Sequence, residues 1–190
     1  MTTGNSTSFR RFEPEHRVSA APGVPLAMLL WQLAGVIERL TDKQYTMKPV
    51  GVIESSIGGH VRHCLDHVSA LLGAIETGQM DYDHRSRGTP VESERRAALS
   101  EIARLEPRVT ELSAEDLDRP IELSVMLTCA GPSMRVATSV GRELAYVLSH
   151  TIHHNALIAT MVKLLGGWLP ERFGYAPSTV AHLEKLACAR

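Results

Sequence analysis

Histidines are the residues of this chain whose positions suggest a reaction centre. His150 and His154 are four residues apart, and His60, His63 and His67 form a second group earlier in the chain. On an α-helix, side chains at positions i and i+4 point the same way, about one turn apart. Two such rings and a third from a facing helix can hold a divalent metal ion and leave one coordination position open. The histidines therefore predict a three-nitrogen metal site, provided that both groups lie on helices that face each other.

Two other interpretations of the histidines have to be weighed. A zinc peptidase of the His-Glu-x-x-His type is not expected, because Thr151 and not a glutamate follows His150. A buried histidine is also often an ordinary core residue whose ring nitrogens are hydrogen-bonded. A plain helical bundle with such core histidines is therefore the alternative to the metal site.

The charge balance and the cysteine content argue against several classes of protein. The chain has 190 residues with 20 basic and 21 acidic side chains, so its net charge is −1 and a nucleic-acid partner is not expected. The three cysteines, Cys64, Cys129 and Cys188, are far apart and odd in number, which fits a reducing cytoplasm better than a disulfide framework. No apolar run approaches the roughly 18 residues of a membrane span. We expect a cytoplasmic protein without a membrane partner.

Apolar periodicity predicts a mainly helical chain with four long helices. Their expected ranges are Pro25–Leu40, Ser55–Ile75, Glu92–Leu112 and Ser139–Leu165. Pro107 interrupts the third range, so we expect a kink or a break near Glu106. A short helix is expected at the end of the chain, near Ser178–Ala187.

A different pattern lies between the third and fourth helices. Apolar and polar residues alternate over Ile121–Leu127 and again over Met134–Thr138, on either side of a turn at Cys129–Ser133. This pattern predicts a small β-hairpin inserted in a long crossover. Residues 1–20 are polar and are expected to form a flexible N-terminal tail, whereas residues 21–190 are expected to form a single domain.

Helical projection at about 100° per residue places the candidate side chains relative to the core. On the fourth helix, His150 and His154 fall inside the apolar arc together with the carboxylate of Glu143. On the second helix, the three histidines line one shoulder of the apolar arc, and Asp66 lies further round. Glu143, His60 and Asp66 are therefore the candidates for proton transfer beside a metal ion.

The segment that follows the second helix contains two further candidates. Arg85 and Arg87 are separated by one residue, and a guanidinium can bind a carboxylate through two hydrogen bonds. They are candidates for contact with an anionic substrate or cofactor at the mouth of the site. The alternative is an ordinary solvated loop.

The two histidine segments, taken together, resemble those of a known family. Residues 56–67 read Ser-Ile-Gly-Gly-His-Val-Arg-His-Cys-Leu-Asp-His, and residues 149–158 read Ser-His-Thr-Ile-His-His-Asn-Ala-Leu-Ile. Their order and spacing resemble the motifs of the DinB/YfiT-like family. The resemblance implies an all-α fold, a four-helix bundle with a long crossover that often forms a homodimer. It also implies that His63, His150 and His154 hold a divalent metal ion.

The resemblance carries expectations about function as well. Some members of the family transfer a low-molecular-weight thiol, and the resemblance therefore implies a metal-dependent enzyme acting on a small molecule, by thiol transfer or by metal-water hydrolysis. Zinc suits three nitrogen ligands, and nickel, iron and manganese are the other candidates. This chain has Asn155-Ala156-Leu157 where Arg-Gly-Gln is usual in the family, so the substrate of its relatives does not transfer directly. The competing hypothesis is a non-catalytic metal-binding or structural homodimer.

Overall fold

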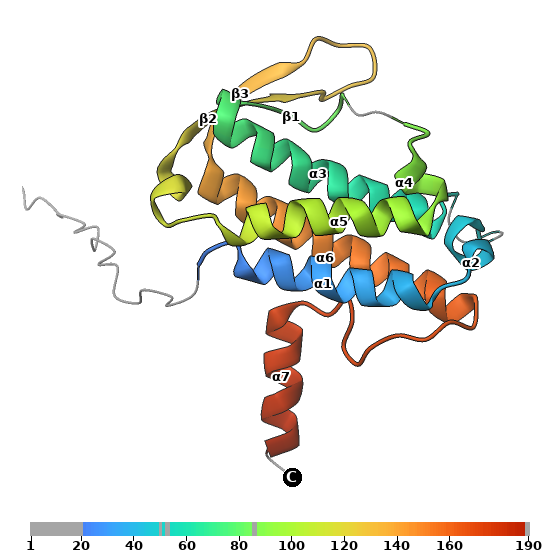
Figure 1. The fold of residues 1–190 in the computed structure, drawn as a ribbon. Helices are drawn as coiled ribbons and strands as arrows, with labels where there is room; N and C mark the ends of the chain where they lie inside the picture. The colour runs from blue at the N-terminus through green and yellow to red at the C-terminus, as the bar shows by residue number, and fades with distance from the viewer. Residues whose placement is uncertain (1–20, 50, 52–53, 85–86, 189–190) are drawn as a thin grey trace, which may run out of the picture.

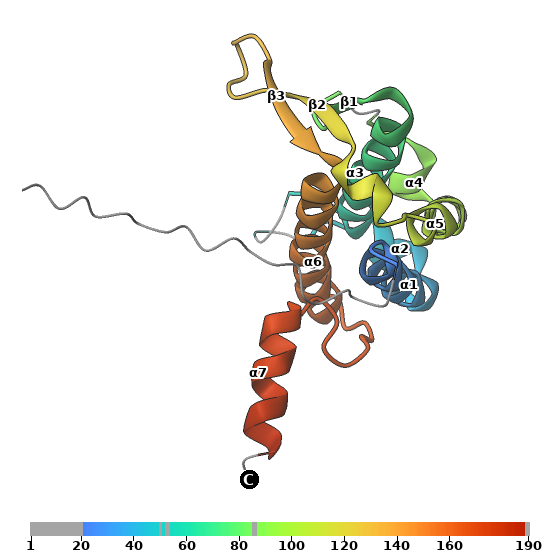
Figure 2. The same ribbon diagram turned by 90° about the vertical axis from the view of Figure 1, so that its left-hand side faces the viewer.

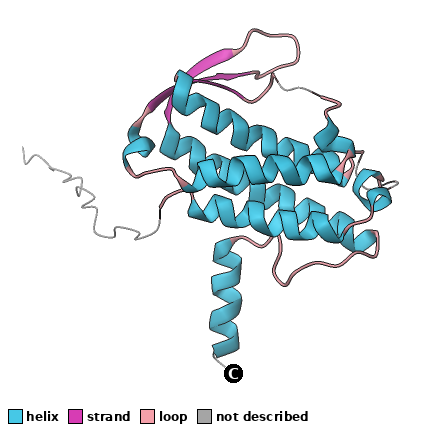
Figure 3. Ribbon diagram, in the orientation of Figure 1, coloured by secondary structure: helices cyan, strands magenta, loops and turns pink. Residues whose placement is uncertain are grey.

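The computed structural model describes residues 21–188 except 50, 52–53 and 85–86, so the predicted tail at 1–20 lies outside the described residues. The described chain is mainly helical and carries one small three-stranded sheet (Figures 1 and 3). None of its helices is long and apolar enough to cross a membrane.

Four long helices form the body of the protein, and they match the four predicted ranges closely. They are α1 (Val24–Arg39), α3 (Ile57–Thr77), α5 (Arg95–Thr110) and α6 (Val140–Leu164). Helix α3 packs against both α5 and α6, and α1 packs against the same two helices from the other side (Figures 1 and 2). Each helix contributes a row of buried aliphatic side chains to a continuous core. Helices α3 and α6, which carry the two histidine groups, therefore lie directly against each other.

The ends of these two helices are set by local signals in the sequence. The hydroxyl of Ser56 accepts a hydrogen bond from the backbone N–H of Gly59 at the start of α3, and Ser139 does the same for Arg142 at the start of α6. Such caps satisfy N–H groups that have no partner within the helix. Gly78 ends α3 in the left-handed conformation, with φ of 69°, which glycine adopts without steric cost.

The third long helix differs from its prediction. The break expected near Glu106 is absent, and Pro107 lies inside α5. Proline removes one backbone hydrogen bond, but this one lies in the last turn, where the buried side chains of Leu105 and Val109 still hold the helix against the core. The break lies instead at Glu94, whose extended backbone separates α5 from the short α4 (Pro90–Ser93).

One short helix was not predicted. Helix α2 (Asp42–Thr46) follows α1, at the point where the sequence suggested only a helix end. Thr41 and Gln44 form a reciprocal capping box, in which each side chain binds the backbone N–H of the other residue. The Thr-x-x-Gln pattern is a known signal for a helix start.

The sheet consists of β1 (Gln79–Asp81), β2 (Pro120–Val125) and β3 (Met134–Ser139), in that order. Strands β2 and β3 pair antiparallel, with Leu123 opposite Val136. Strand β1, which was not predicted, pairs parallel to β2 and directly follows α3. A 3₁₀ turn, η1 (Glu115–Asp118), precedes β2. The sheet therefore lies beside the C-terminal end of α3 and the N-terminal end of α6 (Figure 2).

The last helix stands apart from the rest. Helix α7 (Pro177–Cys188) projects away from the four long helices (Figures 1 and 2), and none of its residues is buried. Leu183 and Leu186 are exposed on it.

Candidate metal centre

Three histidine rings from the two facing helices converge on one point. His63 comes from α3, and His150 and His154 come from α6. One ring nitrogen of each lies within 4.8 Å of the others, and the Nε2 atoms of His63 and His150 are 2.8 Å apart. Helices that pack face to face can build a metal site in this way. The convergence on which the predicted site depends is present in the structure.

The helical position of each ring explains this geometry. Next to the histidines of α6 lies a row of fully buried side chains at four-residue intervals, Val147, Thr151 and Asn155. His150 and His154 precede Thr151 and Asn155 by one residue, and both are only partly buried. The pair was predicted to point into the core, but it lies at the edge of the core, on the flank that faces α3. A partly open position leaves room for a ligand to enter.

Two further histidines contact this cluster. The Nδ1 atom of His60 lies 2.9 Å from the Nδ1 atom of His154, so one of the two donates a hydrogen bond to the other. His67 is almost fully buried, and its Nδ1 lies 2.8 Å from the backbone oxygen of His63. Because a carbonyl oxygen can only accept, the proton of His67 resides on Nδ1. The ring of His67 also stacks on that of His150, with 4.4 Å between the centroids.

Burial keeps two of these rings in the form that binds metal ions. Desolvation, followed by the neighbouring charges of His150 and His60, lowers the pKa of His154 to about 3. Desolvation also lowers the pKa of His60, with a smaller effect from His153. Both rings are therefore neutral near pH 7, and neutral imidazole is the form that coordinates a metal ion.

Two polar residues close to His63 on α3 have surroundings that the structure defines. Asp66, a predicted proton acceptor, forms an ion pair with Arg62 at 2.7 Å, and Arg62 pairs in turn with Glu92 at 3.1 Å. Cys64 is fully buried, and its burial raises the pKa of the thiol to about 12. A buried thiol that stays protonated is a core residue and not a thiolate ligand.

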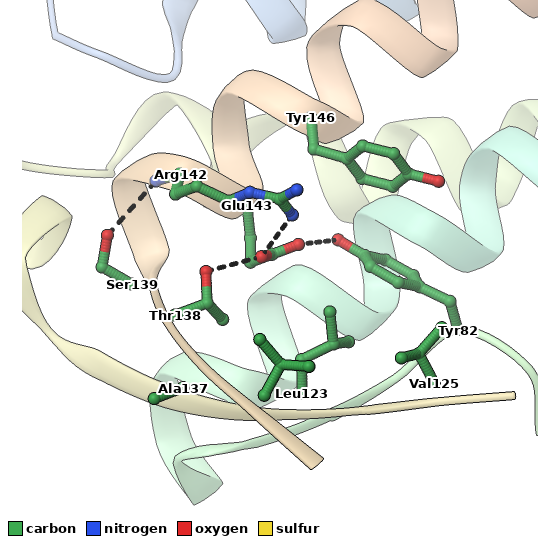
Figure 4. A pocket seen from close by; sticks show the side chains of 10 residues that line it. Tyr82, Leu123, Val125, Ala137, Thr138, Ser139, Arg142, Glu143 and Tyr146 are labelled. Carbon is green, nitrogen blue, oxygen red and sulfur yellow. Dashed lines mark hydrogen bonds and ion pairs between the residues drawn. The ribbon is translucent and has the colours of Figure 1, made fainter. Parts of the chain in front are cut away.

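Glu143 has three hydrogen-bond donors around it (Figure 4). Its side chain is fully buried. One carboxylate oxygen accepts from the hydroxyl of Thr138 and the guanidinium of Arg142, both at 2.7 Å. The other oxygen accepts from the hydroxyl of Tyr82 at 2.9 Å. Burial and the carboxylate of Glu143 raise the pKa of Tyr82, so this hydroxyl keeps its proton. Sequence reasoning proposed Glu143 as a proton acceptor at the metal, whereas the structure shows it bound to these three donors.

A pocket of about 710 Å³ lies over Glu143, between the β2–β3 hairpin and the start of α6. Two of its walls are tyrosines that also contact the histidine cluster. Tyr82 stacks on His67 with 4.6 Å between the centroids, and Tyr146 stacks on His150 with 5.5 Å. The pocket is therefore separated from the histidines by a single layer of aromatic rings. Sequence reasoning did not identify it, because its walls come from three separate segments of the chain.

The replacement Glu143→Gln is expected to lower the free energy of unfolding by about 1–3 kcal/mol, because the neutral amide loses the charge-assisted bonds of the buried carboxylate and offers one acceptor oxygen in place of two. The matched control is Glu122→Gln on β2, whose partly exposed carboxylate pairs with the exposed Arg135 and is expected to contribute less than about 1 kcal/mol. Urea denaturation of both variants measures the difference. Equal stability of the two variants would show that the buried hydrogen bonds of Glu143 contribute little.

Of the two candidate arginines, Arg87 belongs to the part of the chain that the structure describes. Arg85 lies outside the described residues, and Arg87 is exposed in the segment between β1 and α4. The role proposed for them in anion contact stays a prediction.

A mainly helical protein in which histidines from two facing helices converge has a cluster of the kind that could hold a metal ion. A sequence model of the DinB superfamily matches residues 30–158, which include all three converging histidines, and the chain belongs to this superfamily.

A solved structure supports the fold. The chain is similar in structure to a DinB-like protein from Bacillus subtilis, with a TM-score of 0.57 and 17% identity, over 82% of this chain and 99% of that one. It is also 37% identical over 107 residues to a protein of Rhizopus delemar named FK506-binding protein 5. That match covers 56% of this chain but only 28% of the fungal protein.

Proposed function

We propose that this protein is a metal-dependent enzyme that acts on a small molecule, built on a DinB-type four-helix bundle. His63, His150 and His154 are the proposed ligands of one divalent ion. The observation that supports this proposal is the convergence of their ring nitrogens within 4.8 Å, from two helices that are far apart in the sequence. An accidental group of core histidines would not require the nitrogens to point at one another.

The donor set fits a divalent ion. Three neutral imidazoles add no negative charge, so a bound ion would remain a strong Lewis acid, able to lower the pKa of a coordinated water or thiol. Zinc suits a tetrahedral site with three nitrogens, and nickel, iron and manganese also accept imidazole ligands. His60 contributes by holding the ring of His154 in place through the hydrogen bond between their Nδ1 atoms.

Thiol transfer is the reaction that we favour, with a low-molecular-weight thiol as cosubstrate, and hydrolysis by a metal-bound water comes next. Both use a nucleophile made available at neutral pH, and the pocket beside the histidines offers space for a small molecule. The buried thiol of Cys64 does not supply the nucleophile, because burial keeps it protonated.

A non-catalytic, metal-binding homodimer is the second candidate. The dimer in this alternative is supported by α7, which projects from the four long helices and exposes Leu183 and Leu186. An isolated helix of this length is only marginally stable in water, and packing against another chain would stabilise it.

Elemental analysis and a thiol-transfer assay test the proposal together. The full chain is expected to carry one divalent ion per molecule and, when loaded, to accelerate conjugation of a low-molecular-weight thiol to 1-chloro-2,4-dinitrobenzene. Chelation should abolish the acceleration, and adding zinc should restore it. Bound metal without such a reaction or any metal-dependent ester hydrolysis would favour the non-catalytic alternative. Absence of stoichiometric metal, with no rise in thermal stability when metal is added, would refute the metal site.

A further inference from the structure

The pocket over Glu143 has an apolar floor formed by one face of the hairpin. Leu123 and Val125 of β2 and Val136 of β3 line it. Leu123 and Val136 are directly paired across the two strands, so their side chains lie on the same face of the sheet. This floor suits the hydrocarbon part of a ligand.

The acidic group of the pocket is not free to attract a cation. Both oxygens of Glu143 already accept hydrogen bonds, three in all, and one of these comes from a single N–H of Arg142 at 2.7 Å. The proton of Tyr82 is used in the same network. A ligand that offered only donors or a positive charge would therefore have to compete with contacts that are already made.

The groups that remain at the rim are hydrogen-bond donors. Arg142 is 61% exposed and uses one N–H for Glu143, whereas a guanidinium has five. The hydroxyl of Ser139 accepts from the backbone N–H of Arg142 and keeps its own proton to donate. The ring of Tyr146 lies beneath the guanidinium, 5.5 Å from it, and limits the directions in which Arg142 can turn. A pocket with an apolar floor and hydrogen-bond donors at its rim suits a ligand that has an apolar body and an acceptor group at one end.

We propose that this pocket binds a small organic acid, with its hydrocarbon body on the hairpin floor and its carboxylate at Arg142. This inference rests on the proposed function in one respect, because it names the class of the substrate. A bound acid would lie against Tyr82 and Tyr146, the two rings that stack on the histidine cluster. The pocket volume of about 710 Å³ is in the range of sites for small molecules.

Isothermal titration with three probes of equal chain length tests the ligand class. Hexanoate, hexan-1-ol and hexylamine are titrated into the full chain, first after chelation so that the carboxylate cannot bind a metal ion, and then with zinc added. Hexanoate is expected to bind most tightly and hexylamine least. Arg142→Gln should weaken hexanoate about tenfold and leave hexan-1-ol nearly unchanged, which is the effect of one charge-assisted hydrogen bond. The matched control, Arg135→Gln on β3, removes an arginine that pairs with Glu122 and does not line the pocket.

A second variant keeps the test decisive if Arg142→Gln does not fold. Val136→Trp fills the floor from the edge of the hairpin and should abolish binding of hexanoate and hexan-1-ol, with folding checked by circular dichroism. Equal binding of the three probes, equal losses in Arg142→Gln and Arg135→Gln, or unchanged binding in folded Val136→Trp would overturn the inference. Metal content is measured on the same samples. Hexanoate binding by a chain that takes up no metal even when zinc is added would refute the proposed function alone. Stoichiometric metal uptake by a chain that does not bind hexanoate would refute this inference alone.

Discussion

His150→Ala is expected to lower the affinity of this protein for a divalent ion on the order of a thousandfold, and His63→Ala should do the same. Each replacement removes one of the three nitrogens that converge between α3 and α6. Loss of a hydrogen-bond partner behind a ligand already costs about 10–100-fold in metal affinity, so loss of the ligand itself must cost more. Competition against a chromophoric chelator measures the metal affinity of both variants.

Two neighbouring histidines give this test its controls. His153→Ala changes an exposed residue on the same helix as His150. Its ring contacts the edge of His154, with 5.4 Å between the centroids, but it is not one of the three rings whose nitrogens converge. Its removal should therefore change the affinity only a few-fold, as is usual for an exposed side chain. His60→Ala should lower the metal affinity by an intermediate amount, about 10–100-fold, because His60 only holds the ring of His154 in place. If both His63→Ala and His150→Ala kept full metal content, the ligand assignment would be wrong.

The helices that carry the histidines could be predicted because their signals are local. The serine caps at Ser56 and Ser139, the glycine at Gly78 and the apolar period all lie within the segments that they define. The i, i+4 spacing likewise placed His150 and His154 side by side before their environment was known. Their positions at the edge of the core, and not inside it, depend on how α3 packs against α6, which periodicity alone does not give.

Features that depend on contacts between distant segments could not be predicted from the sequence. Strand β1 has three residues, too few for a recognisable alternation, and its pairing with Glu122 and Leu123 joins it to a strand far along the chain. The environment of Glu143 depends in the same way on Tyr82, which lies 61 residues earlier. The continuity of α5 through Pro107 reflects tertiary packing, which outweighs local preference.

The packing at the start of α3 predicts a second large effect. A side chain at Gly58 would collide with the backbone oxygen of Glu92 and would lie 2.7 Å from a ring carbon of Tyr45. Neither group can withdraw easily. The oxygen belongs to the backbone of α4, and the fully buried Tyr45 is held by its hydrogen bond to the backbone oxygen of Val91 at 2.7 Å. Gly58→Ala should therefore lower the free energy of unfolding by about 1–3 kcal/mol.

The same helix provides the control for this prediction. Gly73 is also within α3, and a methyl group there would meet no atom within 4 Å other than those of its own turn of helix. Gly73→Ala should raise the free energy of unfolding by about 0.5–1 kcal/mol, because alanine is the better helix former. Urea denaturation of the two variants should thus give changes of opposite sign. Equal stability of both would mean that the contact between α3 and α4 can relax. Because Gly58 lies within two turns of His60 and His63, we also expect Gly58→Ala, and not Gly73→Ala, to weaken metal binding.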